Sequence, residues 1–273
     1  STQQDILFLQ VEQPVASVDA GEDKFYDRAI RWEFKAHNFT AASFYTPFLV
    51  KSKQIDPKGP FKNGIFNVYL DEIDDWASKI DEFDFVLISS ARWFDRASVY
   101  YENGTVIGCS YCNVHEITEL PMQLGFRKAM RTAFKAINGR EGFKGVTILR
   151  TLSPSHFENG GWNEGGDCLR IAPWKAEEAK LTDEDHDQYM IQLEEFKAAK
   201  GEAAEIGRKY SVLDVTRAMT MRPDGHPRMH REWSKTKSRV NNDCVHWCLP
   251  GPIDTWNDLL LEILKRKEWD VTL

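Results

Sequence analysis

The segment Asn241–Asn257, which reads NNDCVHWCLPGPIDTWN, concentrates side chains that could do chemistry. It contains a carboxylate, Asp243, and an imidazole, His246. If the segment forms a helical turn, the two side chains lie three residues apart on one face. In a Ser-His-Asp triad the imidazole takes the proton of a hydroxyl nucleophile, and the carboxylate fixes the tautomer of the imidazole. The pair therefore predicts the acid and the base of such a triad.

Two other interpretations of these residues remain open. An Asp-x-x-His spacing also occurs on ordinary protein surfaces, where it has no catalytic role. If the segment is a strand, Cys244, His246 and Cys248 alternate onto one side as candidate zinc ligands. A closed zinc site would then need a further ligand from elsewhere in the chain.

The stretch DCVHWCLPGPIDTWN resembles a motif of the plant trichome birefringence-like proteins, Asp-Cys-x-His-Trp-Cys-Leu-Pro-Gly followed by Asp-x-Trp-Asn. That family consists of polysaccharide O-acetyltransferases with an esterase-like fold of the SGNH type. The resemblance implies that Asp243 and His246 are the catalytic acid and base. It also implies that Trp247 and the prolines shape the loop, and we count Trp247 among the candidate substrate contacts.

The nucleophile of that family is the serine of a Gly-Asp-Ser motif, which occurs nowhere in these 273 residues. Ser1–Pro14 has the pattern of a helix tail that Pro14 ends. A similar Val-Glu-Gln-Pro follows the nucleophile helix in the family, so Val11–Pro14 implies that the serine lies shortly before Ser1. We therefore expect one SGNH-like domain over residues 1–273 that lacks its N-terminal nucleophile segment.

Composition limits the classes of partner. Hydrophobic residues make up 42% of the chain, which is enough for a substantial core. The net charge of −7 argues against nucleic acid and anionic membranes as main partners. No apolar run approaches the roughly 20 residues that span a bilayer. We expect no bound metal or cofactor.

Two N-glycosylation sequons begin at Asn38 and Asn103. If they are used, the chain passes through a secretory, oxidising lumen. That compartment permits disulfides, which are the expected state of clustered cysteines there.

Five cysteines cannot all pair within the chain. Cys109 and Cys112 could form a redox pair, but no thioredoxin-like context surrounds them, so a local disulfide is favoured. The resemblance implies a second disulfide between Cys168 and Cys244. It leaves Cys248 without a partner in this chain.

Three segments are predicted as strands of one sheet: 84–90, which is the clearest buried strand, 145–151, and 210–215, the last central strand. Helical stretches separate them, which favours a three-layer α/β fold with a mostly parallel sheet. This agrees with the SGNH/GDSL-hydrolase-like fold that the resemblance implies.

Ligands of such sheets gather beyond the carboxyl ends of the strands. Ser89, Arg92 and Trp93 follow the first strand, and a polar loop at 152–163 follows the second. Ser89 stands where the family commonly has an oxyanion-hole asparagine. That loop matches an Arg-Thr-x-Ser-Pro-x-His-Phe-Glu-Asn-Gly-x-Trp-Asn run of the xyloglucan-related subgroup. The candidate substrate contacts are Arg92, Trp93, His156, Trp162 and Trp247.

The remaining segments follow from local patterns. Two strands between 25 and 50, a surface loop at 51–64 and a hairpin at 100–112 are expected. Helices are expected at 71–80, at 118–138 with a solvated basic face, at 181–208 with a stripe of Tyr189, Leu193 and Phe196, and at 254–267 with Asp254 as N-cap. In the polar loop 222–239, Pro223, Gly225 and Pro227 argue against a helix that would make His226 and His230 metal ligands. Both are predicted as surface histidines.

The function expected from the resemblance is acetyl transfer to a cell-wall polysaccharide, with xyloglucan as the substrate, an acetyl donor as co-substrate and the Golgi lumen as the location. Intact relatives are expected to have an N-terminal membrane anchor that this chain lacks. An acetyl esterase would use the same residues with water as the acceptor. A binding protein without catalysis, with Trp93 and Trp162 as stacking surfaces, is the alternative from another class.

Overall fold

The computed structural model describes residues 15–20, 28–55, 64–228 and 242–266. The expectations for Ser1–Pro14 and for His230 lie outside these residues. The described strands form three sheets. None of the described helices is both long enough and apolar enough to cross a bilayer.

A parallel sheet of three strands lies at the centre of the fold. It contains β6 (Phe85–Ile88), β9 (Val146–Arg150) and β10 (Lys209–Leu213) in the order β10-β9-β6. All the pairings are parallel, as the sequence predicts.

Within the described sheet only β9 is central. The prediction that segment 84–90 is the best-buried strand is wrong, because Phe85 and Leu87 are 38% and 43% exposed and β6 is an edge strand. The prediction that the strand near 210 is central is also wrong, since β10 is the other edge. An apolar run indicates a strand but does not determine its position in the sheet.

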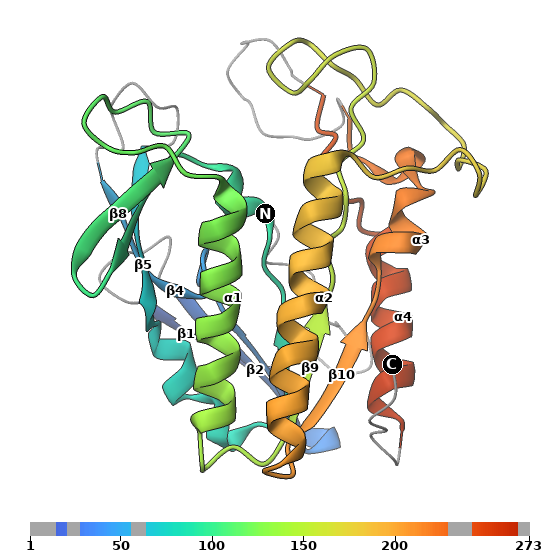
Figure 1. Ribbon diagram of the computed structural model, residues 1–273. Coiled ribbons are helices and arrows are strands. Elements are labelled where there is room, and N and C mark those ends of the chain that lie inside the picture. Colours follow the sequence, from blue (N-terminus) through green and yellow to red (C-terminus); the bar gives the residue numbers. More distant parts are fainter. Residues whose placement is uncertain (1–14, 21–27, 56–63, 229–241, 267–273) are drawn as a thin grey trace.

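Helices cover both faces of this sheet. Successive side chains of β9 point to opposite faces of the sheet. Val146 and Ile148 pack toward α3 (Thr216–Thr220) and α4 (Pro252–Leu264). Leu149 packs toward α1 (Met122–Gly139) and α2 (Asp183–Ala204) on the other face. Figure 1 shows α1 and α2 side by side, with α4 beyond β10. The expected three-layer arrangement is therefore present.

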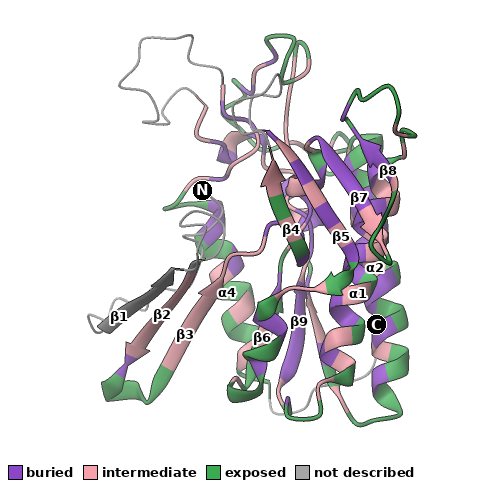
Figure 2. Cartoon of the chain, turned by 90° about the vertical axis from the view of Figure 1, so that its left-hand side faces the viewer, coloured by how far each residue is buried: buried purple, intermediate pink, exposed green. Residues whose placement is uncertain are grey.

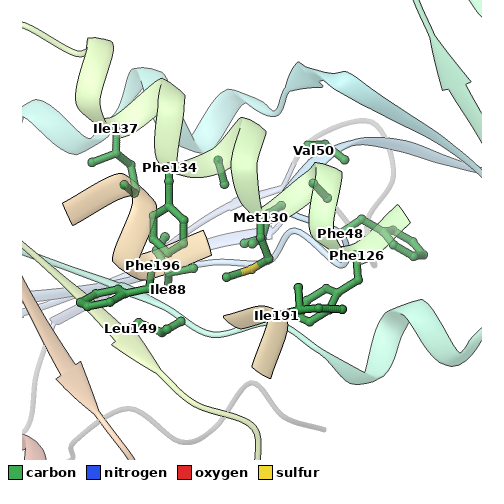
Figure 3. Packing of buried hydrophobic residues seen from close by; sticks show 14 of the residues in the cluster. Phe48, Val50, Ile88, Phe126, Met130, Phe134, Ile137, Leu149, Ile191 and Phe196 are labelled. Carbon is green, nitrogen blue, oxygen red and sulfur yellow. The ribbon is translucent and has the colours of Figure 1, made fainter. Parts of the chain in front are cut away.

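The main core lies between α1, α2 and the sheets. Phe126, Met130 and Phe134 of α1 pack with Ile191 and Phe196 of α2, as Figure 3 shows. The predicted helix at 118–138 is present, although it begins four residues later. Its basic face is not simply solvated, because Arg127 and Arg131 both pair with Glu195 of α2.

The second sheet has the order β4-β5-β7-β8 and packs against α1 (Figure 2). Its strands are β4 (Val50–Ile55), β5 (Ile65–Ile73), β7 (Ser98–Glu102) and β8 (Thr105–Ser110). The hairpin of β7 and β8 is confirmed. Its turn residues Asn103 and Gly104 have φ values of 50° and 70°, which a two-residue hairpin turn requires.

Two predictions in this region are wrong. The part of the expected loop at 51–64 that the structure describes is mostly strand, since β4 pairs with β5 while its lysines face solvent. The expected helix at 71–80 is instead the end of β5, followed by the 3-10 turns Asp75–Ser78 and Ile80–Glu82. Both errors arise from the pairing between β4 and β5, which local patterns do not reveal.

The third sheet is antiparallel and contains β1 (Val15–Ala20), β2 (Arg28–Phe34) and β3 (Phe39–Phe44). The expected turn between the last two strands is the 3-10 turn Lys35–His37, which Asn38 ends with a φ of 47°. The prediction of two strands in this region is confirmed.

Helix α2 packs differently from the predicted apolar stripe. Of Tyr189, Leu193 and Phe196 only Phe196 is fully buried, whereas Gln188 and Gln192 are 0% and 1% exposed. Gln192 Oε1 accepts a hydrogen bond from Leu152 N at 2.7 Å, and its Nε2 donates to Ser90 O at 2.8 Å. The helix therefore anchors both chain segments that leave the carboxyl ends of β6 and β9.

Candidate active site

Asp243 and His246 face each other. His246 Nδ1 lies 3.0 Å from each carboxylate oxygen of Asp243. The Asp243 side chain is 6% exposed, whereas that of His246 is 31% exposed. Because the carboxylate accepts at Nδ1, the neutral ring carries its proton there and its basic lone pair on Nε2. This tautomer suits a general base.

The Asp243 carboxylate also builds the local backbone. Its Oδ1 accepts from the backbone N–H of Val245 at 3.3 Å and from that of His246 at 3.0 Å. Such an Asx-type turn explains how three residues bring the carboxylate and the imidazole together.

Hydrogen bonds from residues 225–228 and from the loop after β9 hold the segment 243–248, which we call the acid–base loop. Arg228 and Asp243 exchange two backbone hydrogen bonds of 3.1 and 3.0 Å. The N–H of His156 donates to Cys244 O at 3.0 Å, and that of Cys248 donates to Gly225 O at 2.9 Å. In Figure 1 the loop after β9 and the segment before α4 lie at the top, the end to which β9 and β10 point.

Helix α4 fixes the far side of the acid–base loop. It begins at Pro252, and Gly251 N donates to Asp254 Oδ2 at 2.7 Å. Asp254 is therefore the third helical residue and not the N-cap that the sequence predicts. Gly251 has a φ of 142°, a conformation that favours glycine.

Both expected disulfides are present, one between Cys168 and Cys244 and one between Cys109 and Cys112. All five cysteines lie in the described ranges, and Cys248 is the one without a disulfide. Burial raises the pKa of its thiol.

The zinc interpretation of the acid–base loop fails, because Cys244 is in a disulfide and the segment is not a strand. In the part of the chain that the structure describes, one group has the spacing of metal ligands: Cys109, Cys112 and Glu119. Its two sulfurs are bonded to each other.

Trp247 is buried beneath the acid–base loop. It is 8% exposed, and its ring centroid lies 4.3 Å from that of His226, 5.7 Å from that of His156 and 6.0 Å from that of Trp256. The expectation that Trp247 contacts substrate does not fit this burial. Its position agrees with the loop-shaping role that the resemblance implies.

The prediction that His226 is a surface histidine is wrong. The residue is 3% exposed, and burial lowers its pKa to about 4. His226 Nδ1 lies 2.7 Å from His246 O, and its Nε2 lies 2.8 Å from His156 Nδ1. The polar sequence around His226 gave no signal of this burial, which depends on Trp247.

Ser89 lies exposed after the carboxyl end of β6. Arg150, the last residue of β9, donates to Ser89 Oγ at 2.9 Å and to Ser153 Oγ at 3.1 Å. The same guanidinium stacks 4.2 Å from the ring centroid of Trp256, which packs against Trp247. Sequence reasoning missed Arg150, although a charged residue at the end of a buried strand was the available signal.

Arg92 and Trp93 are both half-buried. Arg92 Nη2 pairs with Asp185 at 2.6 Å, and the Asp185 side chain is 2% exposed. Trp93 packs edge-on against Phe48 and Phe66. Arg92 therefore pairs with a buried carboxylate and the half-buried Trp93 packs against the core, and their contacts with substrate stay predictions.

Trp162 does have an open position, since it is 67% exposed in the loop after β9. Beside this loop a hollow of about 220 Å³ is lined by residues of the segments 155–158 and 174–182 and by Pro223. His156 lies in its wall. Asn38 and Asn103 are exposed in turns, and their glycosylation stays a prediction.

Residues 6–263 match the PC-esterase family, described as the GDSL/SGNH-like acyl-esterase family found in Pmr5 and Cas1p. Protein trichome birefringence-like 19 of Arabidopsis thaliana is 51% identical over 96% of this chain and 61% of its own length. Protein trichome birefringence-like 20 of the same plant is 44% identical over 87% of this chain and 50% of its own length.

Xyloglucan O-acetyltransferase 4 of Populus trichocarpa is 43% identical over 95% of this chain and 61% of its own length. The chain thus spans between half and about three-fifths of the length of these three relatives.

Proposed function

Because this chain belongs to the PC-esterase family of GDSL/SGNH-like acyl-esterases, we propose that it carries the acid–base part of the active site of a plant cell-wall polysaccharide O-acetyltransferase that acts on xyloglucan. One observation supports the proposal most directly. The buried carboxylate of Asp243 holds Nδ1 of the partly exposed His246, which is the arrangement that a hydroxyl nucleophile needs.

The reaction would run in two steps. A serine hydroxyl from a Gly-Asp-Ser segment outside these 273 residues attacks the acetyl carbonyl of the donor, and its proton passes to His246 Nε2. The leaving group of the donor takes that proton, and an acetyl-serine remains. A sugar hydroxyl then attacks the acetyl-serine and gives its proton to Nε2, and the serine oxygen recovers that proton as its ester bond breaks.

We assign the Ser89 hydroxyl as the side-chain donor to the tetrahedral oxyanion. Ser89 Oγ accepts a hydrogen bond from Arg150, which orients the hydroxyl at the carboxyl end of the sheet. The guanidinium also adds positive charge near the place where negative charge develops.

The test is acetyl transfer by a polypeptide that joins a Gly-Asp-Ser segment to this chain, with an activated acetyl ester as donor and a xyloglucan oligosaccharide as acceptor. Removing the base in His246→Ala should lower kcat by about 10⁶-fold, and removing the charge that fixes its tautomer in Asp243→Asn should lower it by about 10⁴-fold. His186 is exposed on α2, so His186→Ala is the matched control. Retained turnover in His246→Ala would refute the assignment.

Transfer and hydrolysis differ only in the acceptor. The same assay separates them, because acetylated oligosaccharide accumulates in the first case and free acetate alone in the second. Acetate as the sole product would make the protein an acetyl esterase.

Carbohydrate binding without catalysis is the second candidate, and the exposed ring of Trp162 supports it. Calorimetric titration of the 273-residue chain with a xyloglucan oligosaccharide tests this function. Trp162→Ala should weaken binding by removing a stacking surface, and Trp174→Ala is a second tryptophan variant from the wall of the 220 Å³ hollow.

The setting of this reaction follows from the same proposal. We place it in the Golgi lumen, where disulfides persist and sequons can be glycosylated. The acetyl donor acts as a co-substrate, and a bound cofactor has no part in the mechanism.

A further inference from the structure

A run of hydrogen bonds passes through two histidine rings behind the acid–base loop. His156 Nε2 lies 3.0 Å from Thr220 O, and His156 Nδ1 lies 2.8 Å from His226 Nε2. His226 Nδ1 then lies 2.7 Å from the backbone oxygen of His246. All four ring nitrogens are therefore at hydrogen-bond distance from a partner.

The protons of this run can be counted. Both outer partners are carbonyl oxygens, which only accept, so Nε2 of His156 and Nδ1 of His226 must each carry a proton. Two neutral imidazoles bring only these two protons. The central nitrogens would then point lone pair against lone pair at 2.8 Å. A third proton, and with it one positive charge on the pair, removes this conflict.

We propose that His156 and His226 share one proton between His156 Nδ1 and His226 Nε2, and that this pair positions the acid–base loop through the backbone of His246. Both rings are positioning residues, because His226 reaches His246 at its backbone carbonyl oxygen and His156 acts through His226. The role of this histidine pair in catalysis rests on the proposed function, whereas the number of protons on the two rings does not.

The surroundings admit one charge on the pair and oppose a second. The titratable and charged side chains that act on the two rings come from α2, from the turn after β6, from the loop after β9, from the segment before residue 229 and from the acid–base loop itself: Asp185, Arg92, Glu158, Arg228 and Asp243.

Burial lowers the pKa of both histidines, that of His226 to about 4, and the charge of His156 contributes to the second shift. His156 therefore binds its proton first as the pH falls below the ordinary histidine value near 6.5. The two rings share one proton in the pH range between the titration of His156 and that of His226. Above this pH range the shared proton is absent. Below it both rings are charged, so no proton is shared.

The first test reads the protons directly. In the 273-residue chain labelled with ¹⁵N-histidine, long-range ¹H–¹⁵N correlation distinguishes protonated from unprotonated ring nitrogens. At pH 5 three of the four nitrogens of His156 and His226 should carry protons, and at pH 7.5 only two. Two protons at both values would overturn the proposal, and no variant is needed to see this.

The second test reads the position of the loop. The backbone N–H of His246, which donates to Asp243 Oδ1, should be about fivefold better protected from hydrogen exchange at pH 5 than at pH 7.5, after correction for intrinsic exchange. This factor corresponds to one hydrogen bond of ordinary net strength. Equal protection at the two pH values would refute the positioning role.

A conservative variant separates positioning from mere packing. In His156→Asn an amide N–H that never titrates replaces Nδ1–H, so it can donate to His226 at any pH. The protection of the His246 N–H should then become independent of pH while staying high. In His226→Leu it should be low at both values, and in the exposed control His186→Asn it should follow the native pattern. A His156→Asn chain that keeps the native pH dependence would contradict the proposal.

Failure of this proposal and failure of the proposed function can be told apart. If His246→Ala retains acetyl transfer while the proton count and the exchange data hold, the histidine pair stands and the enzyme assignment falls. If acetyl transfer needs His246 but the pair carries two protons throughout, only the pair is refuted.

Discussion

At the scale of single residues, buried polar groups determine the site more than the exposed ones do. Asp243 orients an imidazole and closes a turn with the same oxygen, because Oδ1 accepts from the backbone N–H of His246 and lies against its ring. A variant at this position thus changes both the chemistry and the backbone. This is why Asp243→Asn, which keeps an acceptor oxygen, tests the chemistry better than alanine would.

Asp95 should make stability depend on pH. Burial raises its pKa to about 6, against the opposing charge of Arg92. Between pH 4 and 6 the native chain therefore keeps a proton that the unfolded chain releases, so the free energy of unfolding falls as the pH rises. The side chain is 32% exposed, and solvent screening should limit the loss to about 1 kcal/mol.

Urea unfolding at pH 4 and pH 6.5 measures this loss. Asp95→Asn keeps an oxygen that can accept from Gln188 but cannot ionise, so the Asp95 part of the pH dependence should disappear. Asp84→Asn, at an exposed position, should leave it in place. If the difference in unfolding free energy between pH 4 and pH 6.5 is the same in Asp95→Asn as in the native chain, Asp95 is already charged at pH 4.

Some of these residues could be found from the sequence and others could not. Asp243 and His246 interact through a spacing of three, which is visible in the sequence. His226 and Arg150 gain their roles from residues that lie 70 and 61 positions away. Trp93 and Trp162 look alike in sequence, but one packs against Phe48 and the other faces solvent. Burial of this kind depends on tertiary packing, which no local pattern contains.

At the scale of elements, α2 carries a buried polar face where an apolar stripe is the usual solution. Gln192 satisfies a donor and an acceptor on the two segments that lead to Ser89 and to the loop after β9. The helix can do this only because the length of glutamine matches both backbone groups. The helix itself was predicted from the sequence, but no local pattern indicated that its buried positions would be polar.

Gln192→Leu should therefore destabilise the chain although it makes the core more apolar. The change leaves Leu152 N and Ser90 O without these partners in a buried environment, which costs about 1–3 kcal/mol. Denaturant unfolding measures the loss, and Lys197→Leu at an exposed position of the same helix is the matched control. Equal stability of native chain and Gln192→Leu would mean that water replaces the amide.

At the scale of the whole molecule, the order of strands and helices predicts the layers but not the division into sheets. The parallel set β6, β9 and β10 follows from strands separated by helices. The partition of the other strands depends on pairings such as β5 with β7, which are parallel. The layer class and the three parallel strands were therefore predictable, whereas β4, β5 and the three separate sheets were not.

The Cys168–Cys244 disulfide joins distant parts of this architecture, with a sequence separation of 76. It fastens the acid–base loop to the middle of the segment between β9 and α2. Closing so long a loop restricts the unfolded chain strongly, so Cys168→Ala with Cys244→Ala should lower the free energy of unfolding by about 2–4 kcal/mol. The pair Cys109→Ala and Cys112→Ala is the matched control, because its separation of 3 restricts the unfolded chain much less.

Urea unfolding compares the two double variants, and a non-reducing peptide map of the native chain checks that Cys168 and Cys244 are linked. Loss of this disulfide should also reduce the exchange protection of the His246 N–H, since Cys244 lies between Asp243 and His246. Loss of the Cys109–Cys112 disulfide, in the region of β8, should not. Equal destabilisation by both double variants would show that local packing around the sulfurs outweighs the restriction of the unfolded chain.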